Sequence, residues 1–344
     1  MEQKVSIIIL NWNGWKDIVE CLESLYQIDY PNYDVIVVDN GSEDESIEMI
    51  RKYAAGDLEI ESNFFEFNPY NKPIQIFEYT NKELESLSNK DTEFDNLDPN
   101  NKLILIKNDH NSGFSEGNNI GMKFSLEILN PDYILLLNND TVVDIHFLAE
   151  LVSFANNDTN IGIVGPKVSY YDNPDKIAYI GHNVDLCNGR IKDPDFKYAK
   201  HASSSVKIDF IVGCGLLVKK SVIEDIGMLD QNYFLYYEDV DWCLRARNSG
   251  YKIVYVPKSK IWHKIPLEEN RSLNSYYYGN RNSFLLLTKN LNSINLLSCY
   301  IRLIFNKSIL SLFLLIKGNK KASFTVIKAV YDGLRGRYGY KKLD

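Results

Sequence analysis

Apolar runs alternate with amphipathic stretches along the first 140 residues of the chain. Residues 5–10, 33–42, 103–108 and 133–140 each open on a short, almost continuous apolar run, which is typical of strands buried on both faces. Residues 14–28 and 111–129 instead carry apolar positions at helical spacing. Strands that alternate with helices predict an α/β fold with a mainly parallel sheet flanked by helices.

Polar clusters follow these predicted strands at the ends where they stop. Asn11, Asp39 and Asp140 close three strands, and Asn111 follows the fourth. One such cluster is ordinarily a turn, because Asn and Asp bond their own backbone. Ligands in open α/β sheets bind beyond the carboxyl ends of the strands, so four clusters at equivalent ends predict a shared site. Ser42, with Glu45 three residues later, also predicts a helix capping box.

Two common nucleotide-binding motifs are missing from the sequence. The first strand is followed by "NWNG" and not by a GxGxxG turn, and no GxxxxGK[ST] phosphate loop occurs. The sequence therefore disfavours a dinucleotide-binding domain and a P-loop NTPase. A nucleotide ligand would have to be held by carboxylates and amides, with a metal ion on its phosphates.

The composition is that of a globular chain with a sizeable core. The chain has 344 residues, of which 45% are hydrophobic and 24% charged. This length predicts one large α/β domain with an appendage, or two domains. We expect the large domain over residues 1–290 and the appendage over 291–344. The five cysteines form no CxxC pair, so we expect reduced, buried thiols in a cytosolic protein. The first ten residues resemble a strand and not a secretion signal.

Charge is unevenly distributed, although the net charge is only −8. Residues 57–102 hold eleven acidic residues against four lysines, and residues 300–344 hold ten basic residues against two acidic ones. Residues 294–318 are apolar, but a polar stripe recurs at helical spacing, which predicts an amphipathic helix. With its basic surroundings, this helix is expected either on an anionic membrane surface or in a bundle against the catalytic domain or a second copy.

Six motifs occur together in one order along the chain: "SIIILNWNG", "VIVVDNGSED", "NSGFSEGNNIG", "YILLLNND", "YYEDVDWCLRARNSGYKIVYVP" and "IWH". In this order they resemble family 2 glycosyltransferases of the GT-A fold, most closely the branch of rhamnosyltransferases and galactofuranosyltransferases. The resemblance covers residues 5–56 and 103–290, and it makes residues 57–102 an insertion. Aromatic residues in that insertion, among them Phe64, Phe65, Phe67, Tyr70, Phe77 and Tyr79, argue against simple disorder.

The resemblance assigns roles to individual residues. Asp140 would meet a Mg²⁺ or Mn²⁺ ion, and His263 would be its second protein ligand. Asn138 stands where the fuller motif has an acid, so the cation is expected to bind mainly together with the donor diphosphate. The donor pocket would be formed by Asn11, Asn13, Asp39, Asn40, Asn111, Gly113, Asn118, Asn138, Asn139, Gly213, Cys214, Gly215 and Arg281.

Three acids in residues 233–251 are the candidates for catalysis. Asp239 would be the general base that deprotonates the acceptor hydroxyl, which requires a carboxylate within hydrogen-bond reach of the nucleophile. Glu238 and Asp241 would orient the loop or the acceptor, and Arg245 would anchor an acid behind the site. Without the resemblance, three acids at a helix N-terminus are also explained by capping and the helix dipole.

The resemblance implies an inverting, metal-dependent transfer of a sugar, with rhamnose as one candidate, from a UDP- or dTDP-linked donor to a glycan or a lipid-linked acceptor. The expected location is cytoplasmic, at the inner face of the cell membrane. A catalytically silent nucleotide-sugar or glycan-binding module is the alternative. A nucleic-acid binder is disfavoured, because the basic tail is aliphatic and lacks interleaved aromatic residues.

Overall fold

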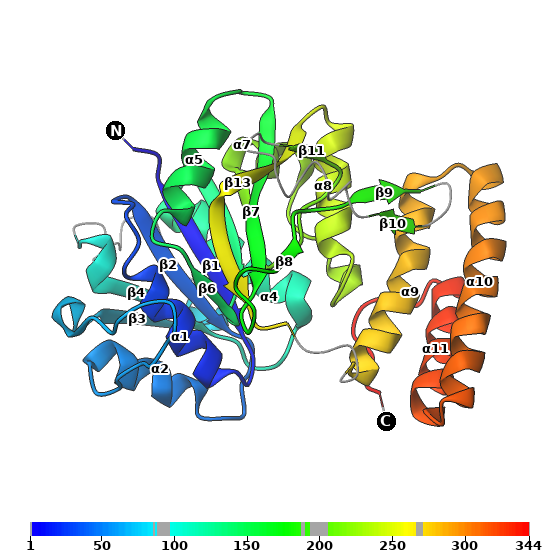
Figure 1. Ribbon diagram of the computed structural model, residues 1–344, viewed down its shortest axis with the longest axis horizontal. Coiled ribbons are helices and arrows are strands. Elements are labelled where there is room, and N and C mark those ends of the chain that lie inside the picture. Colours follow the sequence, from blue (N-terminus) through cyan, green and yellow to red (C-terminus); the bar gives the residue numbers. More distant parts are fainter. Residues whose placement is uncertain are drawn as a thin grey trace.

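A mixed sheet flanked by helices on both faces forms the body of the molecule, and a group of helices stands at one side (Figure 1). The computed structural model describes residues 2–84, 87, 97–186, 190–192, 206–265 and 271–343. The strand order is β11-β13-β7-β12-β5-β1-β2-β4-β3, with β6 paired to β13 and β8 paired to β7. Cys187, one of the five cysteines, lies outside the described residues; the other four are free and buried.

The strands of the main sheet are β1 (Val5–Asn11), β2 (Tyr33–Asp39), β3 (Gln75–Thr80), β4 (Lys102–Lys107), β5 (Tyr133–Asn138), β6 (Thr141–Val143), β7 (Ile161–Tyr170), β8 (Ile177–Tyr179), β11 (Val206–Ile208), β12 (Gly215–Lys219) and β13 (Lys252–His263). A separate hairpin pairs β9 (Asn183–Asp185) with β10 (Arg190–Lys192).

The helices are α1 (Trp15–Leu25), α2 (Ser46–Ala55), α3 (Asn81–Leu84), α4 (Gly113–Phe124), α5 (Phe147–Asn156), α7 (Lys220–Ile226), α8 (Glu238–Asn248), α9 (Leu273–Asn290), α10 (Ser293–Ile316) and α11 (Lys320–Leu334). A π-helical turn over Ser125–Leu129 continues α4.

The first half of the sheet is parallel, as the alternation of strands and helices predicts. β1 pairs in parallel with both β2 and β5, and β4 pairs in parallel with β2 and β3. Beyond β5 the direction changes, because β12 is antiparallel to both β5 and β7. The sheet as a whole is therefore mixed, and the prediction of a mainly parallel sheet describes its N-terminal half.

Both faces of the sheet are covered, which explains why its strands are continuous apolar runs and not alternating ones. In β1, Ile7 and Ile9 pack into one buried cluster together with residues of α1, α2 and α5. Ile8, on the other side of the same strand, packs into a second cluster with residues of α4 and α8. Successive side chains of a strand point to opposite faces, so a strand between two helical layers must be apolar throughout.

The predicted insertion adds an edge strand to the sheet. β3 pairs with β4, and Lys72 reaches back to Glu23 on α1, where Nζ lies 2.9 Å from Oε2 with both side chains buried. The ring of Phe64 lies 4.5 Å from that of Trp262, so the aromatic residues pack on the body as their number suggested. Tyr70 is the exception, because it is 95% exposed. Residues 85–86 and 88–96 lie outside the described residues.

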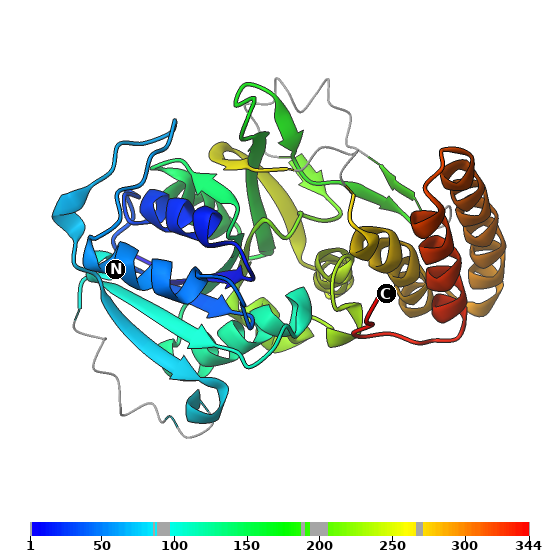
Figure 2. The same cartoon turned by 90° about the horizontal axis from the view of Figure 1, so that it is seen from below.

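The three C-terminal helices form one group beside α8, far from α1 and α2 (Figures 1 and 2). α9 packs closely on α11, and α11 packs on α10. The predicted domain boundary at 290/291 therefore falls inside this helical extension, between α9 and α10. The last residues return to the body, where Gly339 N donates to Asn232 O at 2.9 Å.

The predicted capping box at Ser42 is wrong. α2 begins at Ser46 with Glu45 at its N-cap position and no side-chain cap. Ser42 instead turns back toward the end of β2, where its hydroxyl donates to Asp39 Oδ1 at 2.6 Å.

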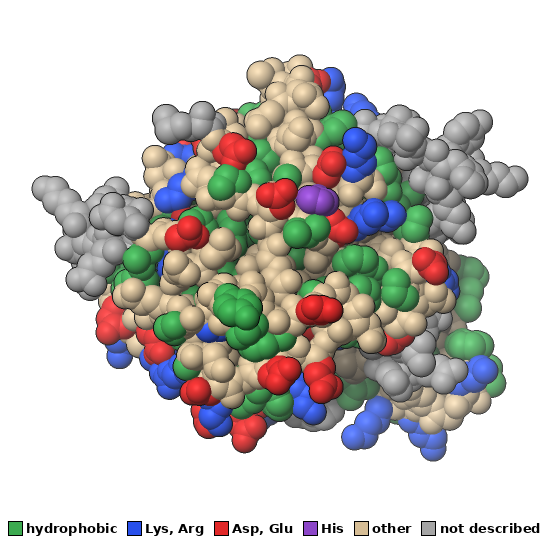
Figure 3. Space-filling view, turned by 60° about the vertical axis from the view of Figure 1, so that its left-hand side comes forward, with side chains coloured by type: hydrophobic (Ala, Val, Ile, Leu, Met, Phe, Trp, Pro, Cys, Tyr) green, Lys and Arg blue, Asp and Glu red, His purple; other side chains and the backbone are tan. Residues whose placement is uncertain are grey.

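On the face of the molecule drawn in Figure 3, acidic and basic side chains of the described residues are interspersed.

Candidate active site

The ends of β1 and β2 form one hydrogen-bonded loop cluster. Asn11 Nδ2 donates to Asp39 Oδ1 at 3.1 Å, and Ser42 N donates to Asp39 Oδ2 at 3.0 Å. Asn13 has a positive φ of 50°, and its side-chain oxygen accepts from Glu43 N at 2.7 Å. Asp39 is buried, and its carboxylate holds this loop together through these hydrogen bonds. Oδ2 retains acceptor capacity, because a carboxylate oxygen has two lone pairs.

A second cluster joins the end of β2 to the start of α4. Asn40 Nδ2 donates to Asn111 Oδ1 at 3.1 Å and to Gly113 O at 3.2 Å. Gly113 has a φ of +87°, and a Cβ there would lie 2.5 Å from Phe234 O, so only glycine fits without strain. Asn118 is less suited to ligand binding, because it is buried and its Nδ2 donates to Phe114 O within its own helix.

The "NND" stretch at the end of β5 connects these loops to His263. Asn139 Nδ2 donates to Asn11 Oδ1 at 2.9 Å. His263 Nε2 lies 3.0 Å from Asp140 Oδ1 and 3.5 Å from Asn138 Nδ2. Burial opposes protonation of His263, but Cys214 and Asp140 raise its pKa to about 10. The predicted strand-end residues thus lie together at one edge of the sheet.

The donor set at this edge fits a divalent cation that also takes oxygens from a ligand. Among the described residues no group of three His, Cys, Asp or Glu side chains is placed to hold a metal ion. Asp140 and His263 supply one carboxylate and one imidazole, both partly accessible at the surface. Such a pair suits Mg²⁺ or Mn²⁺ when phosphate oxygens and water complete the coordination.

The Gly213-Cys214-Gly215 turn links this edge to the candidate base. Gly213 N donates to Asp239 Oδ2 at 3.0 Å, and Asn138 N donates to Cys214 O at 3.2 Å. Gly215 is packed so closely that a Cβ would lie 2.8 Å from Ile261 Cδ1. The thiol of Cys214 is buried at this turn. One turn therefore contacts both Asp239 and the end of β5, two residues before Asp140.

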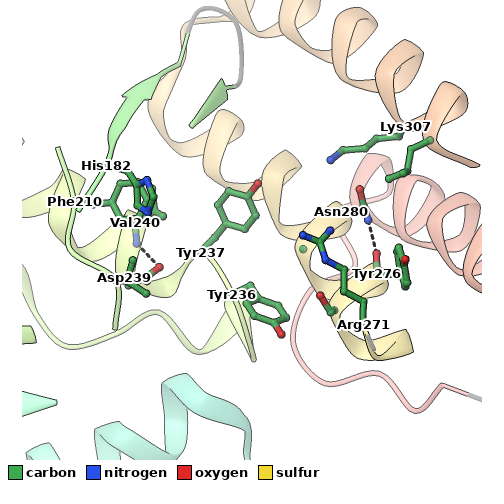
Figure 4. Close-up of a pocket in the computed structure, with 14 residues that line it drawn as sticks. His182, Phe210, Tyr236, Tyr237, Asp239, Val240, Arg271, Tyr276, Asn280 and Lys307 are labelled. Carbon is green, nitrogen blue, oxygen red and sulfur yellow. Dashed lines mark hydrogen bonds between the residues drawn. The ribbon is translucent and has the colours of Figure 1, made fainter. Parts of the chain in front are cut away.

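Asp239 lies at the start of α8, with its carboxylate toward the rim of a cavity (Figure 4). Val240 N donates to its Oδ1 at 2.7 Å. Burial raises the pKa of Asp239, whereas the backbone donors at Gly213 and Val240 and the nearby His182 lower it, and the net shift is upward. A carboxylate with a raised pKa is a better proton acceptor near neutral pH than an ordinary Asp.

Of the two neighbouring acids, Asp241 connects two helices and Glu238 is buried. Asp241 is buried and pairs with Arg245 Nε at 2.9 Å and with Lys289 Nζ at 2.6 Å, so it ties α8 to α9. These contacts confirm that Arg245 anchors an acid behind the site, and the orienting role of Asp241 stays a prediction. Glu238 is also buried, and burial raises the pKa of its carboxyl well above the usual range.

Arg281 does not face the donor. Its side chain is 1% exposed, and its guanidinium donates to Gly339 O and Asn232 O. The group also stacks over the rings of Tyr277 and Tyr278. The prediction that Arg281 binds the donor is therefore wrong, because this side chain holds the C-terminal segment against α9.

A cavity of about 380 Å³ separates α8 from the helical extension (Figure 4). One wall carries Asp239, His182 and Tyr237, and the opposite wall carries Arg271 and Lys307. The sequence does not predict His182, Arg271 or Lys307 as site residues, and it predicts Ser42 only as a helix cap. No local motif marks the three cavity residues, because they come from segments distant in the sequence. Tyr236 and Tyr237 have φ values of 70° and 76°, a strained geometry that is common at functional sites.

Two family models and a curated relative match this chain. Residues 6–69 match the model of glycosyl transferase family 2, and residues 70–277 match that of glycosyltransferase like family 2. The chain is 30% identical over 251 residues to the dTDP-rhamnosyl transferase RfbF of Shigella flexneri, an alignment that covers 69% of this chain and 80% of that protein.

Two solved structures share the fold. The mannosyltransferase PcManGT of Pyrobaculum calidifontis, in complex with GDP-Man and Mn²⁺, superposes with a TM-score of 0.56 at 13% identity, over 98% of this chain and 88% of that one. S. aureus TarS 1-349 with UDP-GlcNAc gives 0.52 at 14%, over 96% and 81%. The expected GT-A fold is confirmed, and the chain belongs to glycosyltransferase family 2.

Proposed function

We propose that this enzyme transfers a sugar from a nucleoside-diphosphate sugar to a hydroxyl group of a glycan or lipid-linked acceptor, with inversion at the anomeric carbon. The observation that carries the proposal is the shared turn at Gly213 and Cys214. Gly213 N donates to Asp239 Oδ2, and Cys214 O accepts from Asn138 N, two residues before Asp140. Because one turn holds both the base and the diphosphate-binding edge, they can act on the acceptor hydroxyl and the leaving diphosphate of the same reaction.

Asp239 acts as the general base. As the acceptor oxygen attacks the anomeric carbon, its proton passes to Asp239, and the bond from that carbon to the diphosphate oxygen breaks. One displacement from the face opposite the leaving group inverts the configuration. The hydrogen bond from Gly213 N to Asp239 Oδ2 holds the carboxylate in place. Burial raises the pKa of Asp239, which makes its carboxylate basic enough to accept the proton.

Asp140 and His263 would hold Mg²⁺ or Mn²⁺ against the donor diphosphate. When bound, the ion offsets the negative charge that develops on the leaving nucleoside diphosphate. The buried network at Asn11, Asp39 and Ser42 would shape the pocket for the base and ribose. PcManGT, which shares the fold, was solved with Mn²⁺ and GDP-Man, and this supports the proposal that the reaction uses a divalent cation.

The donor is proposed to be a UDP- or dTDP-linked sugar. RfbF is described as a dTDP-rhamnosyl transferase, and TarS was solved with UDP-GlcNAc. The relationship to RfbF makes rhamnose the first sugar to test. The PcManGT complex holds GDP-Man, so guanosine donors belong in the same panel.

The helical extension is proposed to rest on the inner surface of the cell membrane. α10 is long and apolar enough to cross a membrane by length and composition, and most of its apolar window is exposed. Its exposed apolar side chains, with those of α11, form what we call the outer apolar set: Ile294, Leu297, Ile301, Phe305, Ile309, Leu312, Ile316, Phe324, Ile327, Tyr331 and Leu334. Arg302 and Asn306 share this surface, so the helix would lie in the interface and not span it.

The test is release of nucleoside diphosphate from a panel of UDP, dTDP and GDP sugars, with Mn²⁺ or with chelator, by the wild type and Asp239→Asn. Metal-dependent release from one donor that the variant loses supports the proposal. The alternative, a catalytically silent binding module, predicts that both proteins bind a donor in a thermal-shift assay and that neither turns it over with any acceptor.

A further inference from the structure

Three residues of the loop before α8 have left-handed backbone angles although each carries a bulky side chain. Phe234, Tyr236 and Tyr237 have φ values of 30°, 70° and 76°. Positive φ is an outlier for such residues, and it persists only where the surrounding structure holds it. Tyr237 is the N-cap residue of α8, and Asp239 follows two positions later. The shape of this loop therefore sets where the carboxylate of Asp239 lies.

Asn282 of α9 holds this loop from the side of the helical extension. Its side chain is fully buried, and its Nδ2 donates to Leu235 O at 2.9 Å and to Tyr236 O at 2.8 Å. A longer contact reaches Tyr233 O at 3.4 Å. An amide nitrogen carries two hydrogens, so the two shorter bonds use both of its donors.

The two carbonyl groups closest to Asn282 belong to the peptide units that set the strained angles. The oxygen of Leu235 lies on the peptide unit that leads into Tyr236, and that of Tyr236 lies on the unit that leads into Tyr237. A peptide unit is planar, so a bond to its oxygen fixes its rotation and with it the φ of the residue that follows. The amide of Asn282 is therefore placed to hold both left-handed tyrosines.

Arg281 fixes which way the amide of Asn282 faces. Its Nε donates to Asn282 Oδ1 at 2.9 Å, so the amide oxygen faces the guanidinium and the amide nitrogen faces the loop. Arg281 is itself held, because its guanidinium donates to Gly339 O. Supporting side chains that are locked by their neighbours keep a site in its productive geometry.

The start of the loop is held by other elements. Phe114 N, in the first turn of α4, donates to Phe234 O at 2.6 Å, and the ring of Phe234 stacks on that of Tyr278 at 5.0 Å. These contacts hold Phe234, whereas Asn282 bonds the peptide units on either side of Tyr236. The half of the loop nearest to Asp239 is thus the half that Asn282 controls.

We infer that Asn282 is a positioning residue for the reaction, which keeps the loop before α8 in its left-handed form and thereby holds Asp239, Tyr236 and Tyr237 at the cavity (Figure 4). The inference rests on the proposed function, in which Asp239 is the base. Asn282 is not among the described residues that line the cavity, so it acts through the loop and not on the substrate. Misplacement of a reacting group by about 1 Å costs about 100-fold in rate.

The experiment compares Asn282→Asp and Asn282→Ala with the wild type, each as the full chain. Asn282→Asp keeps the size of the side chain and an oxygen for Arg281, but an acceptor replaces the donor nitrogen. Asn282→Ala removes the amide. The matched control is Asn290→Ala, because Asn290 lies on the same helix and its Nδ2 donates to Leu286 O within that helix. Thermal unfolding verifies that each variant is folded.

Two readouts are measured on these proteins. Hydrogen–deuterium exchange of residues 233–240, without donor, should be about five- to tenfold faster in both Asn282 variants, because the loop loses two hydrogen bonds. The kcat for release of nucleoside diphosphate should fall about 10- to 100-fold, whereas the donor Kd should stay within about threefold. Asn290→Ala should match the wild type in all three quantities.

A further variant separates positioning from a general loss of stability. Glycine adopts positive φ without steric cost, so Tyr236→Gly relieves the loop of one strained residue. Adding Asn282→Ala should therefore lower kcat about fivefold less in the Tyr236→Gly background than in the wild type, because the two sites are coupled. If Asn282→Ala alone does not fold, recovery of folding by Tyr236→Gly supports the inference, and no recovery contradicts it.

Three results would overturn the inference: unchanged exchange over residues 233–240, a wild-type kcat in folded Asn282→Asp, or equal losses of kcat in the two backgrounds. Exchange is measured without donor, so it does not depend on sugar transfer. Failure of the proposed function would appear as absence of donor turnover by the wild type. Failure of the positioning inference would appear as an unaltered loop or an unaltered kcat in an active enzyme, so the two failures are distinguishable.

Discussion

His263 and Asp140 are 123 positions apart in the sequence, yet His263 Nε2 lies 3.0 Å from Asp140 Oδ1. The pairing of β6 with β13 creates this contact, because His263 stands opposite Thr141 in the antiparallel ladder. Strand register thus places an imidazole beside the carboxylate in the turn between β5 and β6. A pair fixed by backbone hydrogen bonds is pre-organised for a cation in a way that two loop residues would not be.

Removing either member of this pair should weaken metal-dependent donor binding. We expect Asp140→Asn and His263→Ala each to raise the Mn²⁺ concentration required for half-maximal donor turnover by about 10- to 100-fold, since even indirect disturbance of metal ligands costs that much. Turnover across a Mn²⁺ titration measures the effect. Asp172→Asn, which changes an exposed acid, is the control. An unchanged Mn²⁺ requirement in both variants would remove the pair from the metal site.

Replacement of the base should affect the chemical step and not donor binding. Asp239→Asn preserves shape but cannot accept a proton, so kcat should fall by about 10²- to 10⁴-fold. The Kd for the donor, measured by titration calorimetry, should stay within threefold of the wild-type value. Asp225→Asn, at an exposed position, should retain full activity. Retention of most activity in Asp239→Asn would exclude this residue as the base.

The pH profile should show the raised pKa of Asp239. Because burial raises this pKa, the carboxyl becomes protonated as the pH falls at a higher pH than an ordinary Asp, whose pKa is about 4. Activity should therefore be lost on the acid side through that raised value and be retained above it. The measurement is kcat against pH at saturating donor and acceptor. An acid limb at the ordinary Asp value would contradict the assignment.

The insertion should contribute to stability through Lys72. Its Nζ pairs with Glu23, whose Oε1 and Oε2 also accept from Asn68 N and from Tyr53 OH. Lys72→Met leaves a carboxylate buried without its cation, and breaking such pairs costs about 3–5 kcal/mol. Urea unfolding should show a loss of this size, with little change for Lys82→Met, an exposed lysine of α3. Equal stability of the two variants would show that the Lys72–Glu23 pair does not stabilise the fold.

The outer apolar set should govern attachment to vesicles. Fully burying an apolar side chain is worth about 1.5–3 kcal/mol, so the double variant Ile301→Ser and Phe305→Ser should reduce binding to phosphatidylglycerol vesicles more than tenfold. Co-sedimentation provides the measurement. Tyr70→Ser removes an exposed aromatic residue from the insertion and should bind as the wild type does. Equal binding by all three proteins would place the membrane contact elsewhere, and no binding by the wild type would leave a second protein copy as the partner to test.

The sequence by itself determined the elements whose signal is local. Runs such as residues 5–10 predict strands because burial on two faces requires apolar side chains at every position, and β1 is buried as expected. The order of polar clusters at strand ends predicted where the strand-end residues would meet. The edge between β1, β2 and β5 follows from parallel topology, which brings all carboxyl ends to one side.

Only the tertiary structure decided which polar residues of the helices face the site. Arg281 and Lys307 both lie in helices of mixed character, yet one is buried against the C-terminal segment and the other points into the cavity. Asp241 likewise pairs with Lys289 of α9. The side of a helix that meets a neighbour depends on packing between segments far apart in sequence. Local spacing fixes the stripes of a helix, and the packing of the whole chain fixes which stripe lies beside Asp239.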